Sequence, residues 1–314
     1  MKESIGIAKE IQENIRTEKK EHQKRISFSQ YSVYESCPYR WYLTYAKGNY
    51  LFSASIHTIF GTAIHEAIQE YLRILFSESG KAADAFDIEK FFEESFKKEY
   101  KKELENNGGQ HFSDKKEMSE FYEDGIEIIR EFKKKRSQYF SKKDQELLGV
   151  EIPLLVEIKE GDDVFLFYGF MDVVVRDKKD GLVYLDDLKT STKGWTKYEK
   201  ADPVKLSQLL LYKRFFSKQY KIDEKNIVPR YRILKRKLWE NVEFKQSRIQ
   251  MHEPANGTKK VEEAVQRLLV FIDECFEKDG SYKEKEYIKK PSTSNCRFCP
   301  FNNRPDLCNK KNML

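Results

Sequence analysis

The first half of the chain carries the residue spacing of amphipathic helices. Over 61–76, apolar side chains recur every three or four positions, which predicts a helix with one buried face. The aromatic-rich stretch 29–45 predicts another helix, with Ser27 or Ser29 as its N-cap. Two further charged amphipathic helices are expected over 87–105 and 116–141.

The pattern changes near residue 146. Short runs rich in β-branched and aromatic residues, separated by turn residues, predict a three-stranded meander. Its strands are expected over 149–158, 165–175 and 182–190, with turns at 161–163 and 178–181. The elements that follow are a helix over 203–216, a strand pair over 226–237 and 238–249, and a helix over 259–278.

These elements predict an α/β fold with a central mixed β-sheet flanked by helices. An N-terminal helical section precedes the sheet, and a cap that carries cysteines follows it. We expect one integrated domain with four parts: a charged helical arm (1–28), a helical section (29–145), a core (146–285) and a cysteine-rich cap (286–314).

Composition narrows the function only slightly. The 314 residues are 39% hydrophobic and 35% charged, which is typical of a water-soluble chain large enough to bury a substantial core. No apolar run is long enough to span a bilayer, and the start lacks a signal peptide. We therefore expect a cytoplasmic protein without membrane contacts. The net charge of +6 is compatible with nucleic-acid binding but does not identify it.

The run YLDDLKTS, from residue 184, carries the first candidate chemistry. Side chains alternate faces along a strand, so Asp187 and Lys189 are expected on one face and Asp186 and Leu188 on the other. We expect Asp186 to be a solvated neighbour or a support behind the site. A short hairpin can bring Asp172, on the preceding strand, beside Asp187. A carboxylate pair binds Mg²⁺, and a nearby lysine can orient water, as phosphodiester hydrolysis requires.

Four sequence elements in this order resemble the PD-(D/E)XK nuclease superfamily, in its RecB-like branch. GFMDVVV and YLDDLKTS correspond to the catalytic strands. GTAIHE, from residue 61, resembles the helical Gly-x-x-x-His-Glu motif, and SQLLLYKRFF, from residue 207, resembles the Gln-x-x-x-Tyr motif. The resemblance implies a restriction-endonuclease-like core and a metal-dependent deoxyribonuclease.

The resemblance also assigns the ligands of a Mg²⁺ or Mn²⁺ ion. By position in the motifs they are His65, Asp172, Asp187 and the backbone carbonyl of Leu188. Lys189 would position the attacking water. A histidine on a helix is more often structural than a metal ligand, so the assignment of His65 depends on the two aspartates.

Supporting roles follow in the same way. Gln208 and Tyr212 match the motif whose members support the active site and contact DNA, although residues four apart on a helix can simply pack together. Glu151 is a further candidate, because relatives often carry an acid at this place. Lys193 and Trp195, just beyond the lysine motif, are candidates for lining a DNA path.

Five cysteines are unevenly distributed along the chain. Cys296 and Cys299 form a Cys-x2-Cys pair, which chelates zinc or an iron–sulfur cluster, and Cys308 follows. Cys37 is the candidate fourth ligand, whereas Cys275 lies in an amphipathic helix and is expected to be a buried apolar residue.

One cysteine far upstream and three near the C-terminus resemble the iron–sulfur nucleases of the same branch. These include the AddB-type helicase–nuclease subunits and the exonucleases of CRISPR adaptation. The resemblance implies a structural [4Fe–4S] cluster that joins the ends of the chain, with Zn²⁺ as the alternative.

We therefore expect an exonuclease that acts in DNA recombination, repair or CRISPR adaptation. Its substrate would be DNA with a free end or a single strand. Two alternatives are a structure-selective endonuclease with the same centre and a non-catalytic DNA-binding subunit of a repair complex. The chain has no Gly-x4-Gly-Lys-Ser/Thr loop, so a helicase or recombination partner would be a separate protein.

Overall fold

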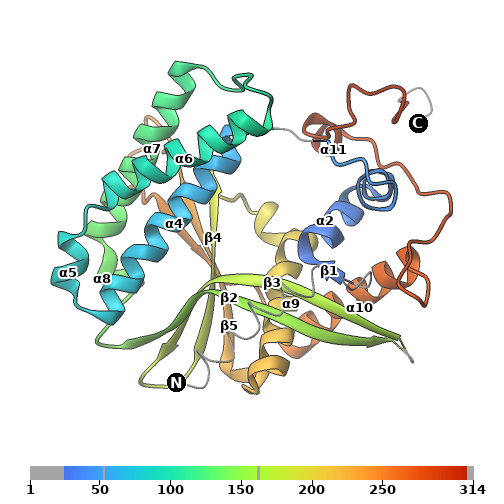
Figure 1. The fold of residues 1–314 in the computed structure, drawn as a ribbon. Coiled ribbons are helices and arrows are strands. Elements are labelled where there is room, and N and C mark those ends of the chain that lie inside the picture. The colour runs from blue at the N-terminus through green and yellow to red at the C-terminus, as the bar shows by residue number, and fades with distance from the viewer. Residues whose placement is uncertain (1–24, 52–53, 161–162, 310–314) are drawn as a thin grey trace.

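A computed structural model describes residues 25–51, 54–160 and 163–309, and it contains a twisted mixed sheet between two groups of helices (Figure 1). The strands are β1 (Arg25–Ser27), β2 (Gln145–Glu160), β3 (Asp163–Asp177), β4 (Val183–Ser191), β5 (Ile227–Lys235) and β6 (Ile249–His252). β2 pairs with β3 along most of its length. Because a strand has two edges, β1 and β4 share the other edge of β3, and β5 and β6 follow beyond β4.

The longer helices cover both faces of the sheet. In chain order the helical elements are α2 (Phe28–Ser36), α3 (Pro38–Trp41), a π-helical turn (Tyr42–Ala46), α4 (Ile56–Ser77), α5 (Gly80–Ala85), α6 (Ile88–Asn106), α7 (Lys115–Lys134), α8 (Arg136–Tyr139), a 3-10 turn (Glu199–Ala201), α9 (Pro203–Tyr220), a second 3-10 turn (Glu224–Asn226), α10 (Thr258–Cys275) and α11 (Thr293–Arg297). None of the helices in the described ranges is both long and apolar enough to cross a membrane.

Two hydrophobic cores follow from this arrangement. On one face, α4, α6 and α7 pack against sheet residues such as Val173 and Leu188. On the other face, α2, α9 and α10 pack against residues such as Leu185 and Tyr231. The sheet is therefore buried on both sides, which explains its continuous β-branched and aromatic runs.

The predicted α/β fold and the three-stranded meander are confirmed, since β2, β3 and β4 pair antiparallel in succession. β4 and β5 are parallel and are joined through α9, which makes the sheet mixed. Ser27 caps α2, because its side chain accepts a hydrogen bond from the backbone N–H of Gln30. The predicted turn at 161–163 falls largely outside the described residues, as does 1–24 of the predicted arm.

Three local expectations were wrong. Residues Arg25–Ser27 form a strand parallel to β3 rather than part of a helical arm, because the edge of β3 offers backbone partners there. The helix expected over 29–45 is interrupted at Cys37, whose backbone is extended before Pro38. The strand expected over 238–249 begins only at Ile249.

The loop before β6 has its own hydrogen-bond pattern. The side chain of Gln246 accepts from the N–H of Trp239 at 2.8 Å and donates to its carbonyl at 2.7 Å. Asn241 has a positive φ of 54°. These contacts replace strand pairing over the residues that sequence periodicity assigned to a strand.

A buried ion pair holds β4 to β5. Asp186 accepts from Arg230 at 2.7 and 2.8 Å and from Arg232 at 3.1 Å. Although burial raises the pKa of Asp186, the two guanidinium groups hold it below its ordinary value. Asp186 is thus a buried support behind the site, and the alternative that it is solvated was wrong.

Replacing Asp186 with alanine should destabilise the fold strongly. Arg232 is only 3% exposed, so the variant would leave a buried cation without its carboxylate. Loss of one partner of a buried pair costs about 3–5 kcal/mol. We expect a decrease of this size in the free energy of unfolding, measured by urea denaturation. Glu105→Ala, at an exposed position of α6, is the control and should change it by less than about 0.5 kcal/mol. A decrease below about 1 kcal/mol for Asp186→Ala would contradict the role of the pair.

Candidate functional site

The candidate site lies at the point where β3 and β4 separate, which we call the fork. Their ladder runs from Arg176 opposite Val183 to Val173 opposite Asp186, and the pairing of the two strands stops there. Beyond this point the backbone N–H of Leu188 donates to Asp172 Oδ2 at 2.7 Å. A side-chain carboxylate therefore takes the place of a strand partner. Since the N–H and C=O of a strand residue point to the same side, the Leu188 carbonyl also faces this gap.

Asp187 and Lys189 extend from the same face of β4, as the two-residue period predicts. Lys189 Nζ donates to Asp187 Oδ1 at 3.0 Å and lies 2.8 Å from Oδ2. The Asp187 side chain is only 4% exposed, and the Lys189 ammonium group lies next to both of its oxygens. A buried carboxylate needs a positive charge beside it, which a bound metal cation would also supply.

His65 reaches the same gap from α4, whose apolar face packs on the sheet. Its Nδ1 lies 3.7 Å from Asp172 Oδ2. Burial, assisted by the charge of Lys189, lowers the pKa of His65 to about 4. The imidazole is therefore neutral at physiological pH, which is the form that binds metals.

The two aspartates are electrostatically strained. Burial raises the pKa of Asp172 and of Asp187 to about 6, even though the charge of Lys189 acts in the opposite direction. Burial also disfavours the charged form of Lys189, but the two carboxylates raise its pKa above the ordinary value. A divalent cation bound between the carboxylates would relieve their repulsion.

Glu151 lies beside this cluster in a strained backbone conformation. Its φ of 51° is unusual for a residue other than glycine and lies within β2, close to a shift in strand register. Gln69 donates to Glu151 Oε1 at 2.5 Å and to the backbone carbonyl of Asp172 at 3.2 Å. Gln69 was missed by the sequence analysis. The sequence did hold a signal for it, because Gln69 is a polar residue on the apolar face of the predicted helix, four positions after His65.

The Gln-x-x-x-Tyr pair lies on α9. Tyr212 is 5% exposed, and its hydroxyl packs against the backbone of Gly169 in β3. Gln208 lines an open groove that also reaches Lys189. Tyr212 is therefore packed into the core, while Gln208 faces solvent-accessible space next to the site.

The four predicted cluster ligands come together in a separate cavity. Cys37, Cys296, Cys299 and Cys308 line one small cavity of about 30 Å³. Burial raises the pKa of the Cys299 and Cys308 thiols. Cys275 lies apart from them in the hydrophobic core, which confirms the expectation that it is a buried residue.

Backbone and side-chain contacts join the residues around Tyr39 to the C-terminal segment beside this cavity, where α11 lies near α2 (Figure 1). The N–H of Tyr39 donates to the carbonyl of Ile288 at 3.1 Å, and its hydroxyl donates to the carbonyl of Leu307 at 3.0 Å. Four thiolates are a donor set that suits iron–sulfur clusters and zinc alike.

Neither group of side chains is closed into a finished metal site. Across the described residues, no three His, Cys, Asp or Glu side chains are arranged tightly enough to enclose a metal ion. At the fork, the ammonium group of Lys189 occupies the space next to Asp187. The donor chemistry still fits Mg²⁺, which takes a few protein oxygens and completes its shell with water and phosphate.

Gly169→Ala should displace Tyr212 and disturb the site behind Asp172. A Cβ at this position would lie 2.8 Å from the Tyr212 hydroxyl and 3.1 Å from its ring. Overpacking of this kind costs about 1–3 kcal/mol. We expect a lower Tm in calorimetry. Adding Tyr212→Phe removes the closest atom and should recover part of the loss; an unchanged Tm in Gly169→Ala would show that the contact is not tight.

Comparison with known proteins places these features in a family. No curated protein matches the chain. Among solved structures, the chain is similar to one titled "Crystal structure of SSO0001", with 16% sequence identity, a TM-score of 0.29, and coverage of 60% of this chain and 72% of that one. The model of the PD-(D/E)XK nuclease superfamily matches residues 25–304. This range includes the fork, the motifs on α4 and α9, and the C-terminal cysteines Cys296 and Cys299, but not Cys308. This chain belongs to the PD-(D/E)XK nuclease superfamily.

Proposed function

We propose that the protein is a Mg²⁺- or Mn²⁺-dependent DNA exonuclease of the RecB-like branch. The observation that carries the proposal is the convergence of Asp172, Asp187, Lys189 and the Leu188 carbonyl at the fork between β3 and β4. Superfamily membership supplies the class of reaction, which is metal-dependent phosphodiester hydrolysis.

Each residue at the fork has a distinct part in this proposal. Asp172, Asp187, the Leu188 carbonyl and His65 would hold the cation, and Glu151 is placed to add a further carboxylate. The cation would supply positive charge to the attacked phosphate and acidify a water molecule.

Lys189 contributes a fixed positive charge. Its ammonium group is held by Asp187 and remains protonated, because the neighbouring carboxylates raise its pKa. A protonated amine at this place can orient the attacking water and offset negative charge that develops on the phosphate. It acts in the transition state more than in substrate binding.

Asp172 keeps the fork open, because its carboxylate binds the Leu188 N–H where strand pairing would otherwise close β3 onto β4. Gln69 supports Asp172 from the other side, since it donates to Glu151 of β2 and to the backbone carbonyl of Asp172. The same centre would serve a structure-selective endonuclease, so the type of cleavage is the first point to test.

For the four clustered cysteines we propose a structural [4Fe–4S] cluster, with Zn²⁺ as the alternative. Support comes from their common cavity and from the contacts of Tyr39 with the C-terminal segment beside it. Recombination, repair or CRISPR adaptation are the pathways in which such a nuclease would act, alone or with a separate helicase.

Asp187→Asn and Lys189→Ala should each abolish cleavage while leaving DNA binding largely intact. The aspartate holds the cation and the lysine stabilises the transition state, whereas phosphate contacts elsewhere supply most of the affinity. We expect a decrease in rate of about 100-fold or more for each variant, measured on end-labelled linear DNA with Mn²⁺. Wild type should shorten linear DNA from an end and leave a covalently closed circle intact.

Asp180→Asn, on the exposed turn between β3 and β4, is the matched control and should cleave normally. Full activity in Asp187→Asn would refute the proposed centre. Efficient nicking of the closed circle would favour the endonuclease. Absence of cleavage by wild type with either metal, in protein that binds DNA, would favour the non-catalytic alternative.

Cys37→Ser should remove the metal at the cysteine cavity. A serine hydroxyl is a poor ligand for iron, so anaerobically purified variant should lose the broad absorbance near about 400 nm that thiolate-ligated clusters give. The contacts of Tyr39 with the C-terminal segment should weaken as well, with a lower Tm.

Cys275→Ser is the control, because this thiol lies in the hydrophobic core away from the cavity. It should keep the absorbance and the metal content. Zinc in colourless wild-type protein would replace the iron–sulfur proposal, and full metal content in Cys37→Ser would exclude Cys37 as a ligand.

A further inference from the structure

The cavity that the four clustered cysteines share has a one-sided charge. Three cationic side chains line it beside the thiols, and we call them the cationic rim: Arg40, Lys289 and Lys290. Among the described residues, no carboxylate lines this cavity. Cysteines that ligate a metal do so as negative thiolates, so the rim opposes the charge of the group that these cysteines would hold.

Two cations of the rim act on different thiols. Arg40 lies in α3, and its charge acts on the thiol of Cys299. Lys289 lies in the segment that leads to α11, and its charge acts on Cys308. Both cations are half-buried, and charges interact more strongly in such surroundings than in bulk water.

Carbonyl groups, not carboxylates, hold the two lysines of the rim. Lys289 Nζ donates to the carbonyl of Asn309 at 3.4 Å, and Lys290 Nζ donates to that of Glu35 at 3.1 Å. The acids of this region pair with other cations, in the pairs Lys47–Glu284, Lys283–Asp273, Lys285–Glu274 and Arg304–Asp306. No ion pair in the described part of the chain includes a cation of the rim, so its positive charge is not neutralised there by an acid.

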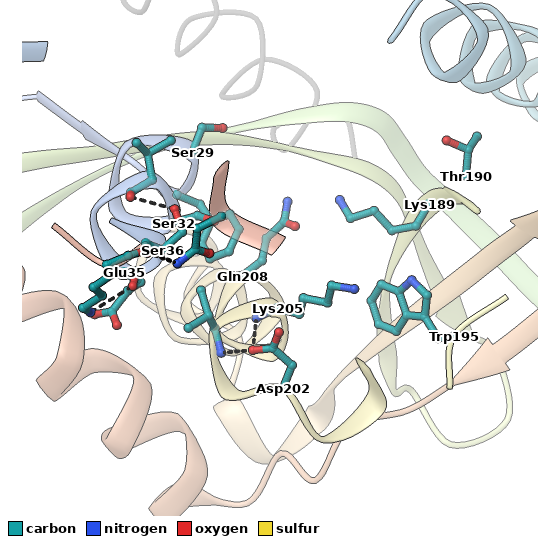
Figure 2. Close-up of a pocket in the computed structure, with 15 residues that line it drawn as sticks. Ser29, Ser32, Glu35, Ser36, Lys189, Thr190, Trp195, Asp202, Lys205 and Gln208 are labelled. Carbon is teal, nitrogen blue, oxygen red and sulfur yellow. Dashed lines mark hydrogen bonds between the residues drawn. The ribbon is translucent and has the colours of Figure 1, made fainter. Parts of the chain in front are cut away.

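Lys290 differs from the other two cations, because it is exposed and also lines a second space. This space is the open groove of about 860 Å³ that reaches from Glu35 and Ser36 of α2 past Gln208 to Lys189 (Figure 2). Salt and water screen a charge that faces such a groove. We therefore expect Lys290 to act on the thiols less than the half-buried cations do.

The remaining walls of the cavity strengthen the effect of the rim. Leu43 and Phe301 line it and are 5% and 1% exposed, so one side of the cavity is apolar. The backbone N–H of Phe301 forms a hydrogen bond with the Cys299 sulfur. Net charge and hydrogen bonds to sulfur are among the factors that determine the reduction potential of an iron–sulfur cluster. Cations and an N–H group both favour the more negative, reduced form.

We infer that Arg40 and Lys289, with a smaller contribution from Lys290, make the cysteine-bound cluster redox-active by stabilising its reduced form. The inference rests on the proposed [4Fe–4S] cluster and is independent of the metal centre at the fork. The electron comes from a low-potential one-electron donor, and one ferric ion of the cluster becomes ferrous. No bond forms or breaks and no proton moves, so the only change is one added negative charge, which the rim offsets.

A redox titration of anaerobically purified protein, followed by EPR of the reduced cluster, tests the rim. Dithionite should reduce the wild-type cluster. At a fixed potential, Arg40→Gln and Lys289→Gln should each lower the ratio of reduced to oxidised cluster by about tenfold, which is about 59 mV for a one-electron couple. Lys290→Gln should lower this ratio by a smaller factor, because its charge is screened.

Two control variants separate charge near the cavity from other effects. Arg297→Gln removes the same charge from the same segment, but Arg297 does not line the cavity, and its guanidinium lies 5.1 Å from the ring centre of the exposed Phe298. It should change the ratio by less than about twofold, since water screens this charge. Arg40→Lys keeps the charge and should retain most of the wild-type ratio.

Iron content, measured on every variant, shows whether the cluster is retained, and Lys289→Gln carries the comparison if Arg40→Gln loses iron. An unchanged ratio in Lys289→Gln with full iron content would overturn the inference, and so would a wild-type cluster that dithionite does not reduce. Zinc in wild-type protein would overturn it together with the iron–sulfur proposal. The expected shifts in a protein that does not cleave DNA would uphold the inference and overturn the proposed nuclease function.

Discussion

At the fork between β3 and β4, two largely buried carboxylates are held together beside a partly exposed ammonium group. The Asp172 carboxylate keeps the strands apart by binding the Leu188 N–H, and Asp187 extends into the resulting gap beside Lys189. Burial raises the pKa of both aspartates to about 6, which means that the folded chain holds them in an unfavourable environment. A site of this kind persists only because the surrounding structure is stable enough to impose it.

The two hydrophobic cores provide that stability from opposite faces of the sheet. The core of α4, α6 and α7 fixes His65 over the gap, while the core of α2, α9 and α10 fixes Tyr212 against Gly169. Asp186 anchors β4 to β5 from the opposite face of the strand. Asp186 and Asp187 thus have different roles, because successive side chains of a strand point to opposite faces. Asp186 faces two arginines, whereas Asp187 faces Lys189 and Asp172.

The two segments that carry the clustered cysteines extend this organisation beyond the fork. The segment before Cys296 bonds to the end of α2 through Asn295, and the same segment brings Lys290 to the groove. Integrity of the cysteine region and the shape of the groove are therefore physically linked, since α2 is shared by both. Tyr39 adds contacts to Ile288 and Leu307 around the cysteine cavity.

Local patterns in the sequence determined most of the secondary structure and the positions of the motif residues. Residue alternation placed Asp187 and Lys189 on one face, helical spacing predicted α4, α6, α7, α9 and α10, and the order of the motifs indicated the superfamily. These features depend on contacts between near neighbours, which a single sequence displays directly.

Tertiary structure alone decided the rest. The parallel strand β1, the contact of Gln69 with Glu151, the burial of Asp186 between two arginines and the groove between α2 and α9 all join residues distant in sequence. The loop before β6 could not be predicted for the same reason. Its residues have the pattern of a strand, but Gln246 bonds to the backbone of Trp239 instead. Such contacts form only when separate elements pack together, so no repeating pattern along the sequence identifies the partners.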